Sequence, residues 1–290
     1  MKKVLITGEH SYIGTSFAEY VAADKEIAAE TVSLRGEGWK ERDFSAYDAV
    51  FHVAGIAHSD GGRLSEEKKR QYYAVNTDLA VAAAEKAKAE GAGQFIYMSS
   101  SIVYGASAPV GKDKFITAET PVNPQNAYGD SKVQAEKALA ALESERFKVV
   151  ILRPPMIYGK NSKGNYPVLA KMAQKLPFFP DIPNSRSMLY IENLCEFVRL
   201  MIVNEERGVF FPQNAGYFST AELVRLIARA HGKNIKLTKF FNPLVRFAGL
   251  FTGKVNKAFG SFRYDMRLSA YKENYRVVSD EESVARTERR

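Results

Sequence analysis

Short apolar runs alternate with amphipathic segments through the first half of the chain. Apolar or β-branched runs predict strands at residues 3–8, 30–36, 48–55, 94–100 and 147–155. Between them, residues 12–24, 76–91 and 126–145 repeat apolar positions near the 3.6-residue period of a helix. Because continuous apolar strands alternate with helices, we predict an α/β fold with a doubly wound parallel sheet covered on both faces.

The pattern changes after Pro155. Residues 163–190 hold four prolines and predict one helix between loops, followed by a helix at 191–206 and a short strand at 209–214. Residues 219–232 predict a helix that begins with Ser219 or Thr220 as its cap. We therefore expect a first domain at 1–155, to which elements around 188–212 return, and a smaller mixed α/β domain at 156–290.

Composition places the chain among ordinary soluble proteins. Its 290 residues are 46% hydrophobic and 26% charged. The single cysteine, Cys195, excludes an internal disulfide and lies in an apolar periodic stretch, which predicts a packing role. The first residues are too short for a signal-peptide core, and no apolar run reaches the length of a membrane span, so we expect a cytoplasmic protein.

The net charge of +8 raises the question of nucleic-acid binding. The basic residues are dispersed among acidic ones, and neither zinc-ligand spacing nor an aromatic RNA-binding signature accompanies them. We expect no nucleic-acid partner and no metal. The charge fits a binder of small anionic molecules, or a protein near an anionic membrane surface.

Gly8, Ser11 and Gly14 follow the first strand and open a helix. In dinucleotide-binding loops one glycine permits the tight turn, the middle one admits the pyrophosphate, and the last allows close helix packing. Ser11 replaces the middle glycine, and its hydroxyl can cap the helix or meet a phosphate oxygen. The loop predicts NAD or NADP binding, with a purely structural turn as the alternative.

The end of the second strand bears on the choice of cofactor. An acidic residue there binds the ribose of NAD, whereas an arginine can accept the 2′-phosphate of NADP. Arg35 stands near this position, beside Ser33. The sequence therefore leans towards NADP, unless Arg35 is only a solvated strand-end residue.

Tyr128 and Lys132 are one helical turn apart, on the same helix face. A nearby ammonium favours the phenolate, so we expect Lys132 to lower the Tyr128 pKa and make the phenol a general base. With fifteen tyrosines in the chain such a spacing also arises by chance. Its meaning comes from the strand before it, which ends in three serines at 99–101, at the sheet edge where ligands bind in doubly wound folds; a polar turn is the alternative.

At these residues the chain resembles a family. "TGEHSYIG", "FHVAG", "YYAVN", "FIYMSSSIVYG", "YGDSK" and "LRPPMIYG" stand in the order seen in the extended short-chain dehydrogenase/reductases of the epimerase/dehydratase group. "RSMLYIENL" and "NYRVVSDEESVARTE" extend the resemblance to nearly the whole chain. It implies a Rossmann domain with a substrate domain, similar to proteins of bacterial capsule and surface-polysaccharide clusters. It also implies a sugar-nucleotide substrate and a homodimer.

The resemblance implies a role for individual residues. Ser100 takes the catalytic hydroxyl position, Tyr128 is the base, and Lys132 binds the nicotinamide ribose. His52 is a structural residue at a strand end. The implied cofactor-binding residues are Gly8, Ser11, Tyr12, Ile13, Gly14, Arg35, Asp43, Phe44, Val53, Ala54, Gly55, Tyr128, Lys132 and Pro155. The implied substrate-binding residues are Ser100, Ser101, Asn165 and Arg186, of which Arg186 grips the substrate diphosphate.

Residues after the catalytic serine narrow the activity. Family 4,6-dehydratases carry an Asp-Glu pair there, whereas this chain has Ser101 and Ile102, and isoleucine cannot abstract a proton. We therefore favour a 4-epimerase, with an NADPH-dependent keto-sugar reductase as the alternative and a non-catalytic dinucleotide sensor as a third possibility. The run from Pro154 to Met156 departs from the asparagine often present in epimerases, which bears on how the nucleotide is held.

A basic amphipathic segment spans residues 243–262. Its apolar residues follow one helical stripe, with Arg246, Lys254 and Lys257 elsewhere. The stripe consists of Leu244, Phe247, Phe251, Val255 and Phe259. Such a helix can associate weakly with an anionic membrane, or it can pack on the substrate domain.

Overall fold

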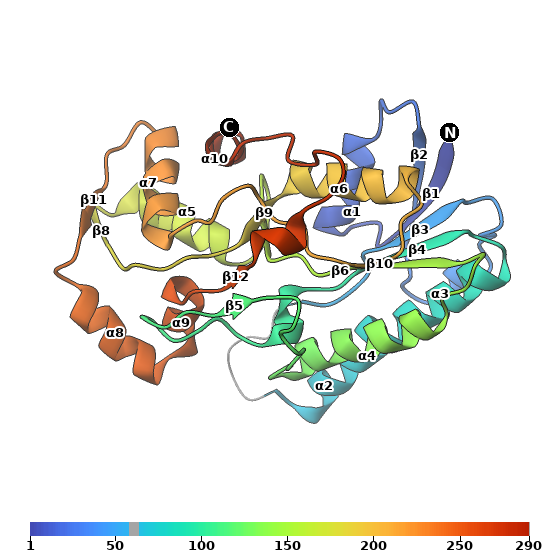
Figure 1. Cartoon of the computed structure of the whole chain (residues 1–290), viewed down its shortest axis with the longest axis horizontal. Helices are drawn as coiled ribbons and strands as arrows, with labels where there is room; N and C mark the ends of the chain where they lie inside the picture. Colours follow the sequence, from blue (N-terminus) through green and yellow to red (C-terminus); the bar gives the residue numbers. More distant parts are fainter. Residues whose placement is uncertain (58–63, 290) are drawn as a thin grey trace. The chain divides into compact units, whose positions relative to one another are not determined.

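The computed structural model describes residues 1–57 and 64–289, and it divides into two compact units (Figure 1). Unit 1 consists of Met1–Gly105, Pro121–Pro154 and Leu194–Pro212, and unit 2 of Ala106–Thr120, Pro155–Asn193 and Gln213–Arg290. The segment Ala106–Thr120 belongs to unit 2, although the predicted boundary at 155/156 placed it in the first domain. The functions assigned to the two parts stay predictions.

A six-stranded parallel sheet forms the centre of unit 1. Its order is β10-β6-β4-β3-β1-β2, and every neighbouring pair is parallel. The strands are β1 (Lys2–Thr7), β2 (Ile27–Val32), β3 (Ala49–His52), β4 (Gln94–Met98), β6 (Lys148–Leu152) and β10 (Gly208–Phe210). The central strands β3 and β4 are buried along their whole length, which is why they read as uninterrupted apolar runs. The predicted doubly wound α/β fold is confirmed.

Helices cover both faces of this sheet (Figure 1). On one face lie α2 (Glu66–Tyr73), α3 (Leu79–Ala89) and α4 (Ala127–Ala141); on the other lie α1 (Tyr12–Tyr20) and α6 (Ile191–Val203). The inner side of α3 consists of four fully buried alanines, Ala80, Ala83, Ala84 and Ala87. Their small side chains let this helix approach the sheet closely.

The order of the strands reverses at β1, since β2 lies on one side of it and β3 on the other. The loops after β1 and β3 therefore leave the sheet in opposite directions, and ligands bind at this point in doubly wound sheets. Strand β2 is displaced from the predicted range and ends at Val32. The backbone N–H of Arg35 donates to the Ser33 hydroxyl at 3.4 Å and Gly36 has a φ of +71°, so a turn replaces the predicted end of the strand. The rest of this connection holds the 3-10 turn η1 (Gly38–Lys40).

Unit 2 consists of helices and short parallel ladders. Its helices are α5 (Asn165–Lys175), α7 (Thr220–Ala230), α8 (Asn242–Phe251), α9 (Gly253–Phe259) and α10 (Asp280–Glu288), with the 3-10 turn η4 (Met266–Ser269). Its ladders pair β5 (Phe115–Ile116) with β12 (Arg263–Tyr264), β7 (Met156–Tyr158) with β9 (Met188–Tyr190), and β8 (Phe178–Pro180) with β11 (Lys236–Thr238). Ser219 caps α7 as expected, because its hydroxyl accepts the Glu222 N–H at 3.0 Å.

The prediction of one helical stripe across residues 243–262 is wrong. Thr252 is extended, with φ −137° and ψ 120°, and separates α8 from α9. Its hydroxyl accepts the N–H of Lys254 at 3.3 Å and caps the second helix. Phe259 is buried, whereas Phe247 and Phe251 are exposed, so the apolar residues serve two different surfaces.

Candidate active site

The loop after β1 lies directly against the segment after β3. Gly8 has a φ of +96°, and a Cβ built on it would come within 2.9 Å of the Ala54 backbone nitrogen. A Cβ on Gly14 would come within 2.6 Å of the Ser11 Oγ and 3.0 Å of the Val53 Cγ2. Glycine is therefore needed at both positions, one for the turn and one for the packing of α1.

Ser11 is the N-cap of α1. Its Oγ accepts the Gly14 N–H at 3.0 Å, and its own N–H donates to the Gly8 carbonyl oxygen at 2.8 Å. Of the two roles open to this hydroxyl, the structure shows the capping role. The first-turn N–H groups of Tyr12 and Ile13 have no acceptor within the helix, and they stand at its positive end. This arrangement fits a pyrophosphate.

The residues expected near the adenosine differ in exposure. Arg35 and Asp43 are exposed, and the Asp43 Oδ1 accepts the Ser45 N–H at 2.8 Å. Phe44 is fully buried in the core of unit 1, and its N–H donates to the Glu90 Oε2 at 2.6 Å. The side chain of Phe44 thus supports the position of Asp43, while contact of either residue with adenine stays a prediction.

Gly55 lies beside the predicted lysine. A Cβ on Gly55 would be 3.6 Å from the Lys132 Nζ and 3.1 Å from the Asn76 Oδ1. Val53 and Ala54, which precede it, are partly buried against the β1 loop. The segment after β3 therefore lies against both the glycine loop and α4, while its contact with a cofactor stays a prediction.

The first turn of α4 places Tyr128 next to Ser100. Asn126 caps the helix by accepting the Gly129 N–H at 2.8 Å, and a Cβ on Gly129 would come within 2.9 Å of the Ile102 carbonyl oxygen. This close approach brings α4 against the 3-10 turn η3 (Ser101–Tyr104). Burial raises the pKa of Tyr128, and its hydrogen bond with Ser100 opposes that rise.

Lys132 is held inside the unit. Its Nζ donates to the Met98 carbonyl oxygen at 2.8 Å and lies 4.5 Å from the centre of the Tyr97 ring. Burial lowers the pKa of Lys132 to about 7, although Glu136 opposes the shift. The expectation that Lys132 lowers the Tyr128 pKa is not met, because burial dominates at the phenol and its pKa is raised.

His52 is a structural residue, as expected. It is fully buried at the end of β3, with its Nδ1 3.0 Å from the Thr7 Oγ1 and its ring stacked on Phe95. Burial, with the charge of Lys132, lowers the pKa of His52 to about 3. His52 is therefore neutral at physiological pH.

Asn76, the last residue of the "YYAVN" segment, also belongs to this cluster, and no role was predicted for it from the sequence. Its Oδ1 accepts the Ile56 N–H at 2.9 Å, and its Nδ2 donates to the Ile56 carbonyl oxygen at 3.1 Å and to the Ser131 Oγ at 3.2 Å. It belongs to the π-helical turn η2 (Ala74–Asp78), a feature often found at functional sites. The "YYAVN" segment was the available signal.

A buried ion pair lies one turn beyond Lys132. The Arg153 Nη2 is 2.6 Å from the Glu136 Oε2, and the Arg153 Nε donates to the Oε1 at 3.1 Å. The Ser99 hydroxyl donates to the same carboxylate, and the Arg153 Nη1 donates to the Tyr104 hydroxyl at 2.8 Å. The pair thus joins α4, β6 and the end of β4, and no local sequence pattern indicated it.

The remaining predicted residues fall at unit boundaries or in unit 2. Ser101 opens η3, and its N–H donates to the Pro154 carbonyl oxygen at 2.9 Å. Pro155 is buried and begins the second segment of unit 2. Asn165 is the first residue of α5. Their contacts with ligands stay predictions.

Arg186 is partly buried in unit 2. Its Nη1 donates to the Gly260 carbonyl oxygen at 2.7 Å, and its backbone bridges to Phe218 and Phe262. Burial lowers the pKa of Arg186 to about 10, so the guanidinium is charged at neutral pH. A fixed, partly desolvated cation of this kind suits a phosphate group, which is the predicted role.

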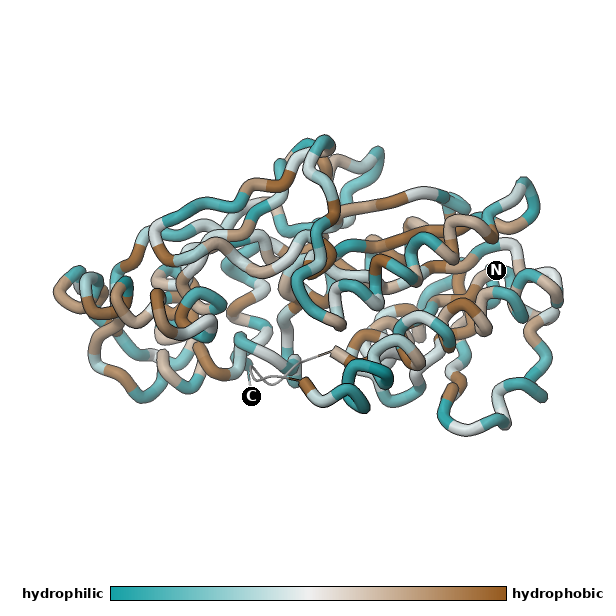
Figure 2. The backbone as a smooth tube through the Cα atoms, turned by 90° about the horizontal axis from the view of Figure 1, so that it is seen from below, coloured by the Kyte–Doolittle hydropathy of each residue, from teal (hydrophilic) through white to brown (hydrophobic). Residues whose placement is uncertain are grey.

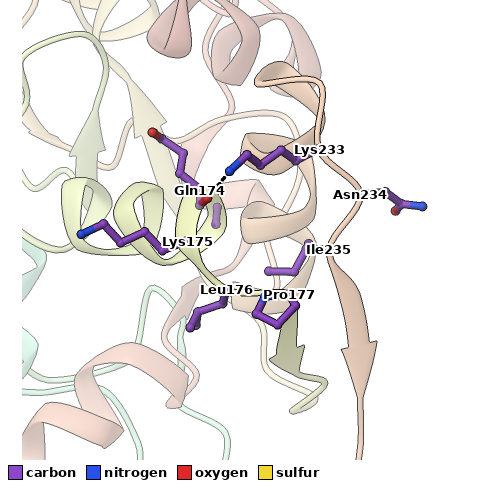
Figure 3. A pocket seen from close by; sticks show the side chains of 8 residues that line it. Gln174, Lys175, Leu176, Pro177, Lys233, Asn234 and Ile235 are labelled. Atoms are coloured by element: carbon purple, nitrogen blue, oxygen red, sulfur yellow. Dashed lines mark hydrogen bonds between the residues drawn. The ribbon is translucent and has the colours of Figure 1, made fainter.

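Two surface hollows lie elsewhere. One of about 310 Å³ in unit 2 is lined by the end of α5 and the connection from α7 to β11, where the Lys233 Nζ donates to the Gln174 carbonyl oxygen (Figure 3). One of about 370 Å³ in unit 1 is lined by Lys2, Asp48 and Gln94, at the amino ends of the strands. Neither contains a predicted site residue.

Within residues 1–57 and 64–289, no group of three or more His, Cys, Asp or Glu side chains gathers as a metal site would require. In the same residues, no helix has both the length and the apolar character needed to cross a membrane. Cys195 is buried in α6, as its sequence context predicts.

Comparison with known proteins supports the dinucleotide interpretation. Residues 4–211 match the NAD dependent epimerase/dehydratase family. The chain is 30% identical to a UDP-glucose 4-epimerase of Vibrio cholerae over 80% of its own length and 76% of that protein. It is 28% identical to an N-acetyl-alpha-D-glucosaminyl-diphospho-ditrans,octacis-undecaprenol 4-epimerase of Escherichia coli O157:H7, over 71% of this chain and 64% of the relative.

A solved structure shares the fold across nearly the whole chain. It is a dTDP-4-dehydrorhamnose reductase of Bacillus anthracis in complex with NADP. The two proteins superpose with a TM-score of 0.70 at 19% identity, over 99% of this chain and 98% of the other.

Proposed function

This chain belongs to the NAD dependent epimerase/dehydratase family, and on that premise we propose that it is a 4-epimerase of UDP-hexoses or UDP-N-acetylhexosamines. The observation that carries the proposal is the cluster at the carboxyl end of β4. Tyr128 hydrogen-bonds Ser100, and the buried Lys132 stands beside the backbone of Gly55. A hydroxyl, a phenol and an amine thus meet where a nicotinamide ring would lie in this fold.

The residues of unit 1 fit a nicotinamide dinucleotide. The first-turn N–H groups of Tyr12 and Ile13 would hold the pyrophosphate, and Lys132 would hold the nicotinamide ribose. When bound, the dinucleotide supplies the hydride acceptor and donor. Arg35, exposed beyond β2, would pair with the 2′-phosphate of NADP.

Tyr128 performs the proton transfer in the proposed mechanism. Its phenolic oxygen takes the proton of the sugar C4 hydroxyl, and returns it after the transient 4-keto sugar has turned over. Ser100 donates a hydrogen bond that favours the phenolate. Lys132, with a pKa of about 7, would change charge within the working pH range while it holds the nicotinamide ribose.

A keto-sugar reductase is the second candidate. The exposed Arg35 favours it, because an arginine at this position suits the 2′-phosphate of NADPH, and a reductase uses one NADPH in each turnover. Tyr128 would then act as the acid that protonates the C4 oxygen. Ser101 and Ile102 argue against 4,6-dehydration, because an isoleucine cannot abstract the proton that water elimination requires. A non-catalytic sensor would bind the dinucleotide without turnover.

The test begins with the nucleotide that the purified chain releases on denaturation. The protein is then incubated with UDP-glucose or UDP-N-acetylglucosamine, and products are separated by anion-exchange chromatography. A 4-epimerase interconverts the C4 epimers without net change in NADPH absorbance, whereas a reductase consumes NADPH in proportion to an added 4-keto sugar nucleotide. Dinucleotide binding with neither reaction would support the sensor.

Two variants connect the activity to the cluster. Tyr128→Phe and Ser100→Ala are expected to lower kcat by about 100-fold or more. Tyr73→Phe is the matched control. The Tyr73 hydroxyl, on α2, donates to Asp130 of α4 at 2.8 Å and lies outside the proposed catalytic set. An equal loss in all three variants would contradict the assigned roles.

We extend the proposal to the setting of the reaction. The resemblance to surface-polysaccharide proteins supports a role in polysaccharide synthesis, by a cytoplasmic homodimer. Light scattering on the purified chain measures the oligomer, and loss of surface polysaccharide in a deletion strain measures the role.

A further inference from the structure

One part of unit 2 exposes large apolar side chains close together. It comprises Phe240 (81% exposed), Leu244 (65%), Phe247 (61%), Leu250 (76%) and Phe251 (75%), on α8 and the residue pair before it. We call these five residues the α8 apolar face. Large exposed apolar surfaces of this kind mark interaction sites on soluble proteins.

The opposite side of α8 is fixed to its own unit. Gly249 is buried, and a Cβ on it would come within 3.0 Å of the Asn256 Oδ1 and 3.2 Å of the Val110 Cγ2. Asn256 also donates to the Gly249 carbonyl oxygen at 2.8 Å, and Asn242 donates to the Asp181 carbonyl oxygen at 2.7 Å. These contacts set the orientation of the helix, so the apolar face is presented outward.

The charged residues of the sequence around α8 are all of one sign. From Lys233 to Tyr264 the sequence holds seven Lys and Arg residues and no Asp or Glu. Lys239, Arg246, Lys254 and Lys257 are exposed, and none forms an ion pair within the described part of the chain. At the left end of the view in Figure 2, apolar and polar positions alternate along the backbone of α8.

We propose that the α8 apolar face binds an anionic lipid bilayer. Aromatic and leucine side chains on one side of a short helix, with lysine and arginine beside them, are the features of interfacial helices. The apolar side chains would enter the boundary between headgroups and acyl chains, and the four cations would meet anionic headgroups. The ten residues of α8 rise about 15 Å, half of the hydrocarbon thickness, so the helix lies on the membrane.

The charges favour a bilayer over a second copy of this chain. A two-fold interface would place the same surface against itself, and the unpaired cations of one copy would face those of the other. An anionic bilayer supplies the complementary charge. This inference is independent of the sugar-nucleotide chemistry proposed for unit 1.

Co-sedimentation of the full chain with vesicles tests the proposal. We expect binding to an equal mixture of phosphatidylcholine and phosphatidylglycerol at low salt, and much weaker binding to phosphatidylcholine alone. Phe247→Ser combined with Phe251→Ser, and separately Lys239→Glu combined with Lys254→Glu, should each weaken binding by about tenfold or more. The charge control is Lys25→Glu with Lys137→Glu, two exposed lysines of unit 1.

Circular dichroism and thermal melting establish that each variant is folded. The proposal fails if the wild-type protein does not bind the mixed vesicles. It also fails if the Lys25→Glu, Lys137→Glu control loses as much binding as the Lys239→Glu, Lys254→Glu variant, which would indicate a general charge effect. A wild-type dimer that dissociates in the phenylalanine variant, without vesicle binding, would show that the face joins two copies instead.

Discussion

The Lys132 Nζ donates a hydrogen bond of 2.8 Å to the carbonyl oxygen of Met98, the last residue of β4. This bond fixes the middle of α4 to the carboxyl edge of the sheet, immediately before the serines at 99–101. The amine is thereby held in a buried position where its charged form is disfavoured, and its pKa falls to about 7. Several properties of the protein depend on this environment.

The first prediction concerns stability and pH. The native Lys132 pKa of about 7 lies below its unfolded value of 10.5, so above pH 7 the unfolded chain binds more protons at this residue. The penalty for burying the ammonium is complete below pH 7 and is relieved as pH rises towards 10.5. The wild type should therefore gain stability relative to Lys132→Met across this window in urea unfolding. A constant difference between the two proteins would contradict the depressed pKa.

The ion pair between Glu136 and Arg153 should be important for stability. Glu136→Gln leaves the Arg153 guanidinium without its buried carboxylate, which costs about 3–5 kcal/mol of unfolding free energy. Guanidinium chloride unfolding measures the change. The double variant Glu136→Met with Arg153→Met should be less destabilised than Glu136→Gln, since no buried charge is left unpaired.

Asn76 should affect cofactor binding through the segment after β3. Asn76→Ala removes its hydrogen bonds to Ile56, and we expect dinucleotide affinity to fall about tenfold as Gly55 loses its fixed position. Thr77→Val is the matched control, because the Thr77 hydroxyl donates to the Ser131 carbonyl oxygen at 2.8 Å and leaves the bonds to Ile56 in place. Isothermal titration calorimetry compares the two. Equal losses would indicate general loosening of α4.

Ser11 should behave as a helix cap. Ser11→Ala removes the acceptor of the Gly14 N–H and should lower the unfolding free energy by about 1 kcal/mol. Ser11→Gly should lower it by only a few tenths of a kcal/mol. Neither change should alter dinucleotide affinity. If Ser11→Ala instead weakened binding strongly at unchanged stability, the hydroxyl would have to contact the phosphates.

Arg35 should decide the preference between cofactors. Arg35→Asp exchanges a cation suited to the 2′-phosphate for a carboxylate suited to a ribose 2′-hydroxyl. The ratio of NADPH to NADH affinity should fall about tenfold or more. Lys25→Asp, an equal charge change at another exposed residue of unit 1, should leave the ratio unchanged. Fluorescence titration with each reduced dinucleotide gives the ratio.

The sequence by itself determined the doubly wound sheet of unit 1 and the order of its candidate site segments. Each buried strand is a local apolar run, and some helices are preceded by a capping residue, as at Ser219 and Asn126. The glycine loop and the Tyr128–Lys132 spacing are likewise local features. Such signals need only neighbouring residues, and they are visible before folding.

Only the tertiary structure decided how these residues act on one another. Lys132 and Met98 are 34 positions apart, and Glu136 and Arg153 are 17 apart, so no local pattern predicts either contact. Burial reversed the expected direction of the Tyr128 pKa. The hydrogen bond from the Gly14 N–H gave the Ser11 hydroxyl its capping role. The break at Thr252 divided one apparent stripe into a buried and an exposed part. Desolvation and packing depend on what the rest of the chain places around a residue, and that is fixed only when the chain folds.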